Sequence, residues 1–508
     1  NRCEVTRPPL NSPGLTPPSV QQRLGVGGYV SWIVVAGLTL LLVGTVAFAQ
    51  FAQSTQVGGD ATSGDLMQAE IQAKMVVGQN SLDQIIPVPA EQKPTVQLPP
   101  EIDNGPYEQR LIYASLKNEL EGPESASVYL DSLDEKSEQL QADEDKYDVA
   151  KEDRFELTEK QKQLRDSMGE LLEDYKKERF DSSYLPEETK SLLKESLGFA
   201  GELFLVPQGS PDTQTRKELL SSAASSIMGV GSVILLGLMA GFLGFVCSIA
   251  LVFFALNGQL HSRFANSASP SGVYIETFAI WMSLFFGCSI LLGFLGMDDS
   301  ANMIAQPFIF FGSLVVLVWP VLRGLTWRQV RQDIGWTIDR PFGDIASAGV
   351  SYVSALPCLV PGIIFVALFM GIVGMFQESH EFGRMAGPGH PIQEYIANGD
   401  ALMLALVFVT ACIAAPIVEE TMFRGVLYRH LRDISHRWAR WSSVAFSALL
   451  NGFIFAAIHP QGIAAIPVLM TLAICFSLTR EWRNSLATPM IMHDIHNSLV
   501  TCVSLLLL

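Results

Sequence analysis

Apolar runs of membrane length alternate with polar connections over the second half of the chain. A helix needs about 20 apolar residues to cross the roughly 30 Å of hydrocarbon in a bilayer. The runs therefore predict a series of membrane helices after Ser226, the later ones short or interrupted. We place them at 227–256, 274–295, 302–322, 346–375, 401–428, 442–458, 463–478 and 486–508.

One further uninterrupted apolar run comes early in the chain, at residues 29–49. Its length predicts a transmembrane anchor over 29–50. A cleaved signal is the alternative, because Ala47-Phe48-Ala49 resembles an A-x-A cleavage site. The anchor is favoured, since the apolar part of a signal usually has about 7 to 15 residues. Together with the later runs it predicts about eight or nine membrane helices.

The other N-terminal segments are polar and differ in composition. Residues 1–28 form a Pro-rich tail that we expect to be disordered. Residues 51–106 are polar and then Pro-rich, which predicts a semi-extended linker. In 107–222 apolar residues recur at helical spacing among many charges, which predicts three or four amphipathic helices. The predicted fold class is all-α, a multispanning membrane helix bundle with an inserted acidic, mainly helical soluble domain.

Composition and charge support this division. The chain is 49% hydrophobic and 17% charged, which is too apolar for a single soluble globule. Residues 52–222 contain 18 Lys and Arg against 35 Asp and Glu, a difference of −17 that equals the formal net charge of the whole chain. The acidic domain is therefore expected to gate or present substrates or to bind a basic protein partner. We expect contact with membrane lipid and no nucleic-acid partner.

The short loops predict an orientation through their arginines, because cytoplasmic loops are enriched in Lys and Arg. The loops on the opposite side are mainly acidic. The N-terminus is therefore expected in the cytoplasm, the acidic domain outside it, and the chain in the plasma membrane, or the inner membrane of a Gram-negative cell. The basic loops carry Arg323, Arg328, Arg331, Arg340, Arg429, Arg432, Arg437, Arg440, Arg480 and Arg483.

The segment 416–425 places two adjacent carboxylates and an arginine at the end of an apolar run. One ionisable group at membrane depth costs about 2.5 to 3.5 kcal/mol on the insertion scale, so three together indicate a functional site. On a helix, Glu420 and Arg424 share one face and can pair. Glu419 is rotated by about 100° and lacks that partner. Glu419 is therefore the reactive candidate.

Two later motifs repeat the four-residue spacing that puts side chains on one helix face: Phe455 with His459, and His493 with Asn497. Buried polar groups in an apolar bundle are expected to find one another. Glu419 and a neutral His459 could then activate a water for attack on a peptide carbonyl. His493 and Asn497 could donate hydrogen bonds to the oxyanion, each typically contributing about 3 to 4 kcal/mol.

In this order, E-E-x-x-x-R, F-x-x-x-H and H-x-x-x-N within membrane helices resemble the motifs of the CPBP family. These are CAAX-processing and bacteriocin-processing intramembrane proteases, also called the Rce1-like or ABI family. The resemblance covers roughly residues 345–508, and residues 227–344 remain membrane helices without an assigned role.

The resemblance implies a glutamate-dependent intramembrane endopeptidase acting on membrane-associated or prenylated substrates. In it, Glu419 and His459 would activate water, and His493 and Asn497 would form the oxyanion hole. The supporting residues would be Glu420, Arg424 and Phe455, the last as a packing residue. The third motif departs from the family pattern, because Asp494 and a second histidine, His496, also flank Asn497.

Counting along the predicted helices raises a difficulty. At 1.5 Å per residue, Glu419 lies about 27 Å from one membrane boundary and His459 about 27 Å from the other. The two can meet only if the helix carrying Glu419 runs on toward Tyr428 and the next helix begins near Arg440.

Other readings remain open. A zinc metalloprotease could use Glu419, His459 and His493 as ligands. We favour a site without metal or other cofactor, because the chain has no H-E-x-x-H motif. The buried charges would also suit a transporter with a proton relay, and the acidic domain would suit a non-catalytic scaffold.

Overall fold

The computed structural model describes most of the chain after residue 62. The tail predicted at 1–28 lies outside the described residues, as does the anchor predicted at 29–50 apart from two glycines. The described residues are 63–85, 97–103, 105–146, 156–264, 272–295, 299–337, 340–376 and 401–507, together with Gly37 and Gly44.

All regular secondary structure in these described ranges is helical, as the predicted fold class requires. Among the described residues, five helices are long and apolar enough to cross a membrane: Thr213–Leu256, Val273–Leu292, Ala301–Leu322, Pro341–Phe369 and Ala401–Ile434. They correspond to α9 (Thr213–Leu256), α10 (Val273–Phe294), α11 (Asp299–Ser313) with η3 (Leu314–Leu317) and α12 (Val318–Leu322), α14 (Pro341–Phe376), and the segment from α16 to α18.

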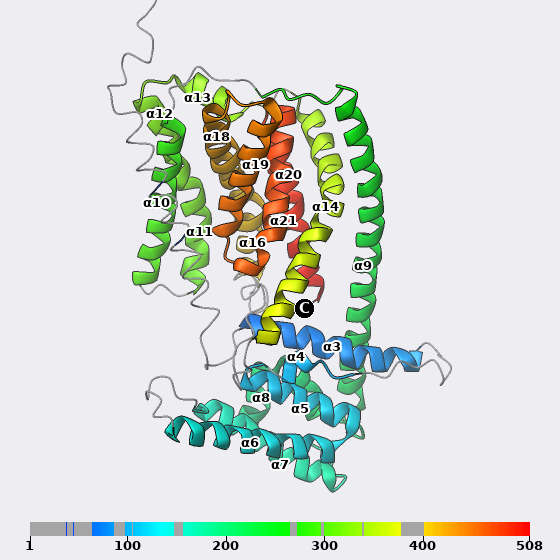
Figure 1. The fold of residues 1–508 in the computed structure, drawn as a ribbon. Helices are drawn as coiled ribbons and strands as arrows, with labels where there is room; N and C mark the ends of the chain where they lie inside the picture. The colour runs from blue at the N-terminus through cyan, green and yellow to red at the C-terminus, as the bar shows by residue number, and fades with distance from the viewer. Residues whose placement is uncertain are drawn as a thin grey trace, which may run out of the picture.

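The last three predicted membrane runs are also helices: α19 (Arg440–Ala457), α20 (Ile466–Arg483) and α21 (Ala487–Leu507). They stand beside the five apolar helices (Figure 1), but they are not among the candidate spans of the described residues. Their polar residues explain this, since α20 ends with Arg480, Glu481 and Arg483. The predicted total of eight or nine spans is thus not established.

One continuous helix carries the Glu-Glu motif. It consists of α16 (Ala401–Phe408), η4 (Val409–Ala414), α17 (Ala415–Glu420), η5 (Thr421–Leu427) and α18 (Tyr428–Ile434), and both η segments are π-helical. Helices with π-turns often mark functional sites. Side-chain amides from two other helices bond to these turns: Asn451 Nδ2 donates to the Phe423 carbonyl at 2.8 Å and Asn497 Nδ2 to the Ala411 carbonyl at 2.7 Å.

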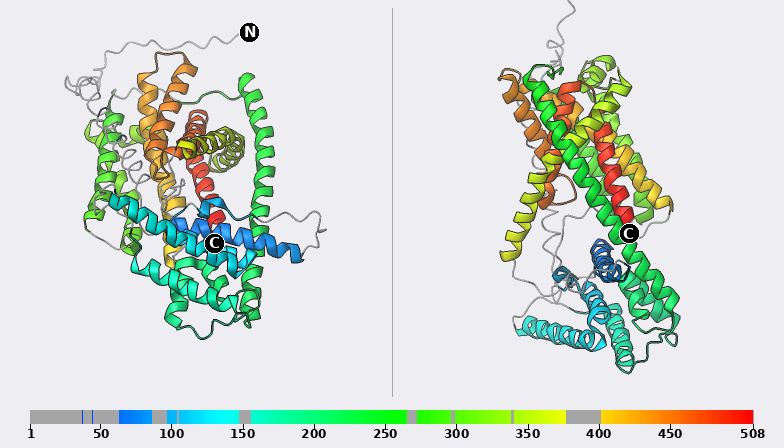
Figure 2. Two further views of the ribbon diagram at one scale, coloured as in Figure 1. Left: turned by 60° about the horizontal axis from the view of Figure 1, so that its bottom comes forward. Right: turned by 90° about the vertical axis from the view of Figure 1, so that its right-hand side faces the viewer.

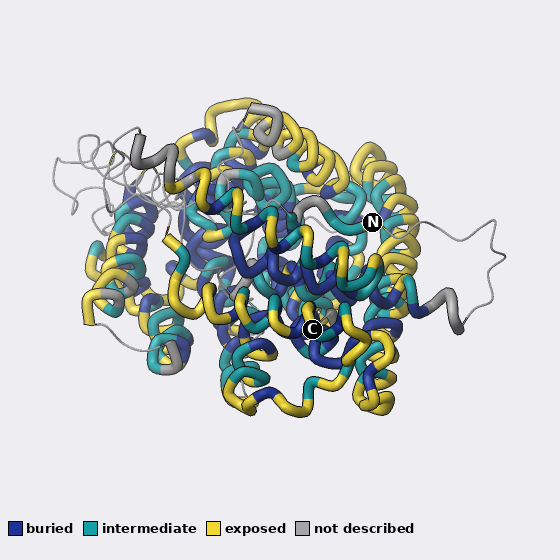
Figure 3. Tube along the Cα trace, turned by 90° about the horizontal axis from the view of Figure 1, so that it is seen from below, coloured by how far each residue is buried: buried dark blue, intermediate teal, exposed yellow. Residues whose placement is uncertain are grey.

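Aromatic packing fixes this helix against its neighbours. Phe423 lies edge-on to Phe278 and Trp281 of α10 and to Phe455 of α19, with ring centroids 5.0 to 5.8 Å apart. All four side chains are buried in one hydrophobic cluster. Seen from below in Figure 3, exposed residues are numerous along the outer helices. Exposed apolar side chains such as Phe242 of α9 suit a surface that faces lipid.

The acidic region contains four helices, within the predicted three or four: α5 (Tyr107–Glu121), α6 (Pro123–Lys146), α7 (Glu159–Lys176) and α8 (Glu187–Leu205). Their apolar faces share one cluster that includes Leu116, Leu164 and Leu197. Thr158 caps α7 through a capping box with Gln161, a local reason for that helix to begin there.

The predicted linker over 51–106 is wrong for its middle part. Residues Ser63–Ile85 form α3, and Pro100–Asp103 form the short α4. The prolines that suggested a linker begin only at Pro87, after α3 has ended. A Cβ at Gly78 would lie 2.3 Å from the carbonyl oxygen of Ala223, so glycine allows α3 to pack closely on α9.

Helices α3–α8 lie at one end of the bundle, and α9 runs from them along its whole side (Figures 1 and 2). The other end carries α13 (Trp327–Ile334) and the turn after α18. The acidic helices and the arginine-rich connections thus lie at opposite ends. Not all these arginines are in loops, however: Arg429 and Arg432 are buried in α18, where they pair with Asp433 and Glu481.

Candidate active site

Glu419 and His459 meet at the centre of the site. The Oε2 atom of Glu419 lies 3.7 Å from Nε2 of His459. The helix of Glu419 continues to Ile434 and α19 begins at Arg440, as the sequence argument required. Glu419 is thus 434 − 419 = 15 residues before the turn and His459 is 459 − 440 = 19 residues after it. Because α19 ends at Ala457, two residues before His459, the two antiparallel segments bring these side chains to a similar height above the turn.

His493 of α21 completes the cluster from a third helix. Its Nε2 atom lies 3.9 Å from Glu419 Oε2, and its Nδ1 atom lies 3.0 Å from Glu420 Oε1. The second histidine of this motif faces elsewhere, because His496 Nδ1 lies 3.3 Å from the hydroxyl of Tyr352 on α14. The structure therefore brings His493, and not His496, to the two glutamates.

The hydrogen bonds at Nδ1 fix the tautomer of both histidines of the cluster. His459 Nδ1 lies 2.6 Å from the Phe455 carbonyl, which can only accept a hydrogen bond. Glu420 is paired with an arginine and is an acceptor toward His493. Each Nδ1 therefore carries the proton, and in a neutral ring each Nε2 presents a lone pair toward Glu419.

Glu420 and Arg424 form the predicted ion pair beneath this cluster. Their side chains have no exposed surface, and Arg424 Nη1 donates to Glu420 Oε1 at 2.8 Å. Arg424 Nη2 donates to the Ala473 carbonyl of α20 at 3.2 Å. Because a buried charge without a partner is strongly unfavourable, each member of the pair keeps the other in place.

Aromatic rings enclose the guanidinium and both imidazoles. Phe455 lies 4.4 Å from Arg424 Cζ, and the centroids of the Phe455 and His459 rings are 4.1 Å apart. Phe476 lies 5.1 Å from Arg424 Cζ, and its ring stacks on that of His493 with centroids 5.1 Å apart and planes at 26°. Phe455 thus packs against Arg424 and His459, and Phe476 packs against Arg424 and His493.

Asn497 lies one turn after His493 on α21, and its amide donates to the Ala411 carbonyl. An amide nitrogen has two N–H groups, so this bond leaves one for another acceptor.

The side chains of the site differ in how far they are exposed. The side chains of Glu419 and His459 are 16% and 15% exposed, against 0% for Glu420 and 5% for His493. The more exposed side of the cluster is therefore that of Glu419 and His459.

Glu419, His459 and His493 are the residues that could hold zinc in the metalloprotease alternative. Tetrahedral ligands at about 2.0 to 2.1 Å from zinc lie about 3.4 Å from one another. The separations from Glu419 Oε2 are longer, at 3.7 and 3.9 Å. Within the part of the chain that the structure describes, no group of three His, Cys, Asp or Glu side chains is arranged to hold a metal ion.

Two buried residues of the site were missed by the sequence analysis. Asn451 stands four residues before Phe455, so extending the four-residue spacing backwards would have found it. Its bond to the Phe423 carbonyl joins α19 to the π-turn after Glu420. Phe476 gave no such signal, because it is one apolar residue in an apolar run.

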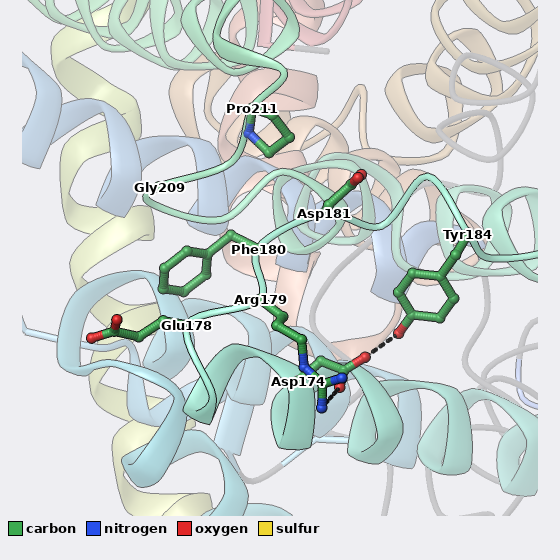
Figure 4. A pocket seen from close by; sticks show the side chains of 8 residues that line it. All are labelled: Asp174, Glu178, Arg179, Phe180, Asp181, Tyr184, Gly209 and Pro211. Atoms are coloured by element: carbon green, nitrogen blue, oxygen red, sulfur yellow. Dashed lines mark hydrogen bonds and ion pairs between the residues drawn. The ribbon is translucent and has the colours of Figure 1, made fainter.

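A separate hollow of about 600 Å³ lies among the acidic helices (Figure 4). Its lining includes Phe180 and Asp181. On one wall, Asp174 pairs with Arg179 and accepts a hydrogen bond from the Tyr184 hydroxyl at 2.6 Å. Burial and this bond to Asp174 raise the pKa of Tyr184 to about 12, so the hydroxyl stays a neutral donor. The hollow shares no residue with the Glu-His cluster.

Comparison with known proteins agrees with the motifs. Residues 401–499 match the sequence model of the family described as type II CAAX prenyl endopeptidase Rce1-like. This segment is therefore similar to the Rce1-like family. It contains all the residues singled out above as candidates: Glu419, Glu420, Arg424, Phe455, His459, His493 and Asn497.

Similar curated proteins are distant. The membrane-embedded CAAX protease MroQ of Staphylococcus aureus is 25% identical over 151 residues, which are 30% of this chain and 59% of that protein. An uncharacterized 24.3 kDa protein of Escherichia coli is 24% identical over 192 residues, 37% of this chain and 77% of that protein. No solved structure matches the chain. The acidic helices thus lie outside the Rce1-like segment.

Proposed function

We propose that this protein is an intramembrane endopeptidase that hydrolyses peptide bonds with a water activated by Glu419 and His459. The observation that carries the proposal is the approach of two histidine Nε2 atoms to one carboxylate oxygen, 3.7 and 3.9 Å from Glu419 Oε2. A water in this space would have a carboxylate and an imidazole lone pair as acceptors. Such an arrangement suits general-base catalysis.

In the proposed reaction, the water oxygen attacks the carbonyl carbon of the substrate while Glu419 takes one of its protons. His493 Nε2, facing the same carboxylate oxygen, can receive this proton and become an imidazolium. The imidazolium then donates to the oxyanion together with the second N–H of Asn497. Collapse of the tetrahedral intermediate breaks the C–N bond, and the proton passes to the leaving amine.

Glu420 and Arg424 would support this chemistry by holding His493. The Nδ1–H of His493 donates to Glu420, which directs Nε2 toward Glu419 whether or not Nε2 is protonated. Arg424 compensates the charge of Glu420 in a site that excludes solvent. None of these steps needs a metal or another cofactor.

The family similarity and the position of the site support a substrate class. Both the Rce1-like description and the name of the staphylococcal relative refer to CAAX proteases. We therefore propose a membrane-associated peptide or protein as substrate, with or without a prenyl group. The test uses the purified full-length protein in liposomes with three fluorogenic probes: a farnesylated CAAX peptide, the same peptide without the lipid, and a membrane-spanning peptide. Cleavage of none of them would contradict the proposal.

We further propose that the basic connections face the cytoplasm and the acidic helices the outside of a plasma membrane, where they contact a basic protein partner. Opposite placement of the two charge classes supports this orientation. Single cysteines at exposed Lys160 and Arg437, in a variant without other cysteines, would test it. In intact cells an impermeant maleimide should label position 160 only. Labelling of position 437 alone would reverse the orientation.

A further inference from the structure

Helix α20 contributes no residue to the three sequence motifs, yet it covers the buried side of the site. Its Phe476 side chain is fully buried and contacts two members of the site. The ring stacks on His493 at 5.1 Å and also lies 5.1 Å from Arg424 Cζ. One side chain thus contacts both residues that bond to Glu420.

The preceding turn of α20 also contacts Arg424. Ala473 is three residues before Phe476 and so lies on the same helix face. Its carbonyl accepts the hydrogen bond from Arg424 Nη2 at 3.2 Å. The guanidinium is therefore held by α20 at its edge, through this carbonyl, and over its face, through the Phe476 ring.

The Phe476 ring stacks on the imidazole of His493. The bond from Nδ1 to Glu420 fixes one edge of the imidazole but permits the ring to tilt about that bond. The Phe476 ring, whose plane is at 26° to that of His493, restricts this tilt by stacking, and the edge-on Phe455 ring contacts the imidazole as well. With the plane set, Nε2 is directed at Glu419, 3.9 Å away.

We infer that Phe476 is a positioning residue of this site, whose ring holds His493 and Arg424 in the orientation that both need to serve Glu419. The inference rests on the proposed protease function for its effect on turnover. The orientation of His493 can be measured independently of any substrate.

The test compares Phe476→Leu, which removes the ring but keeps a large apolar side chain, with Phe476→Tyr, which keeps the ring. The matched control is Leu472→Ala, because Leu472 lies one turn earlier on α20 and belongs to the same buried cluster. Turnover of the farnesylated peptide gives kcat and KM. Carbethoxylation of His493 by diethyl pyrocarbonate is followed by mass spectrometry of the full-length protein in detergent. Its rate reports how accessible the imidazole nitrogen of His493 is to the reagent.

The Leu variant should lower kcat by about tenfold, equivalent to about 1.4 kcal/mol, with KM nearly unchanged. Carbethoxylation of His493 should become faster in it. The Tyr variant should resemble wild type in both measurements, and Leu472→Ala should lose thermal stability but keep kcat. Wild-type behaviour of Phe476→Leu in both measurements, or the same kcat loss in Leu472→Ala, would overturn the inference. If wild type cleaves no probe, the protease proposal fails, while carbethoxylation still decides the role of Phe476.

Discussion

Glu419 Oε2 and His459 Nε2 lie 3.7 Å apart, although their residues are 459 − 419 = 40 positions apart in the chain. The contact arises because both stand at a similar distance from the turn between α18 and α19. A shift of either helix by one residue, about 1.5 Å along its axis and 100° around it, would separate them. Packing of Phe423 on Phe455, with ring centroids 5.0 Å apart, fixes this register.

The two histidines of α21 should respond differently to replacement. His493→Ala removes a contact to both glutamates, so kcat should fall by about 10²-fold or more, as for loss of an oxyanion donor. His496→Ala removes a hydrogen bond and a ring contact to Tyr352, but no contact to Glu419 or Glu420, and should leave kcat close to that of wild type. Steady-state kinetics in liposomes measures both. The reverse order of the two effects would assign the catalytic contact to His496.

Loss of Arg424 should destabilise the protein as well as inactivate it. Arg424→Ala leaves the fully buried Glu420 without its cation, and breaking a buried ion pair in this way costs about 3 to 5 kcal/mol. The melting temperature in detergent should fall markedly. Adding Glu420→Gln to Arg424→Ala removes the uncompensated charge and should restore part of the stability without restoring cleavage. Equal melting temperatures for wild type and Arg424→Ala would show that the pair is not buried as described.

Removal of metal ions should not affect proteolysis. The separations of His459 and His493 from Glu419 exceed those of a tetrahedral zinc site, and no proposed step needs a metal. Cleavage by the liposome-embedded protein should therefore survive prolonged treatment with EDTA and 1,10-phenanthroline. Inactivation by either chelator that added zinc reverses would support the metalloprotease alternative instead.

The contacts among the candidate site residues could be predicted from the sequence better than the structure around them. Spacing alone placed Glu420 and Arg424 on one helix face, where they pair. Because Glu419 and His459 must lie at the same membrane depth to meet, the sequence also required the first helix to continue past Tyr428 and the next helix to begin near Arg440, as the structure shows. Polar residues in an apolar run are rare enough to be informative. Phe476 could not be singled out in this way, because nothing in a run of apolar residues tells which ring faces a histidine.

Composition was a weaker guide in the polar half of the chain. The prolines from Pro87 onward indicate a linker, and this prediction was wrongly applied to the residues before them as well. Those residues form α3, whose buried face includes Ala73, Val76 and Val77. Exposure of arginines was also overestimated. The sequence pattern predicts Arg432 in a basic loop. In the structure Arg432 is buried and pairs with Glu481 on α20, a partner that the sequence spacing does not reveal.

The most direct measurement is the rate of peptide cleavage by Glu419→Gln in liposomes. Gln keeps the shape of Glu419 but cannot take a proton from water, so the rate should fall by about 10²- to 10⁴-fold at unchanged melting temperature. Glu276→Gln is the matched control, because Glu276 of α10 pairs with Arg323, the residue after α12, and not with the site residues. A Glu419→Gln protein that cleaves as fast as wild type would contradict the account.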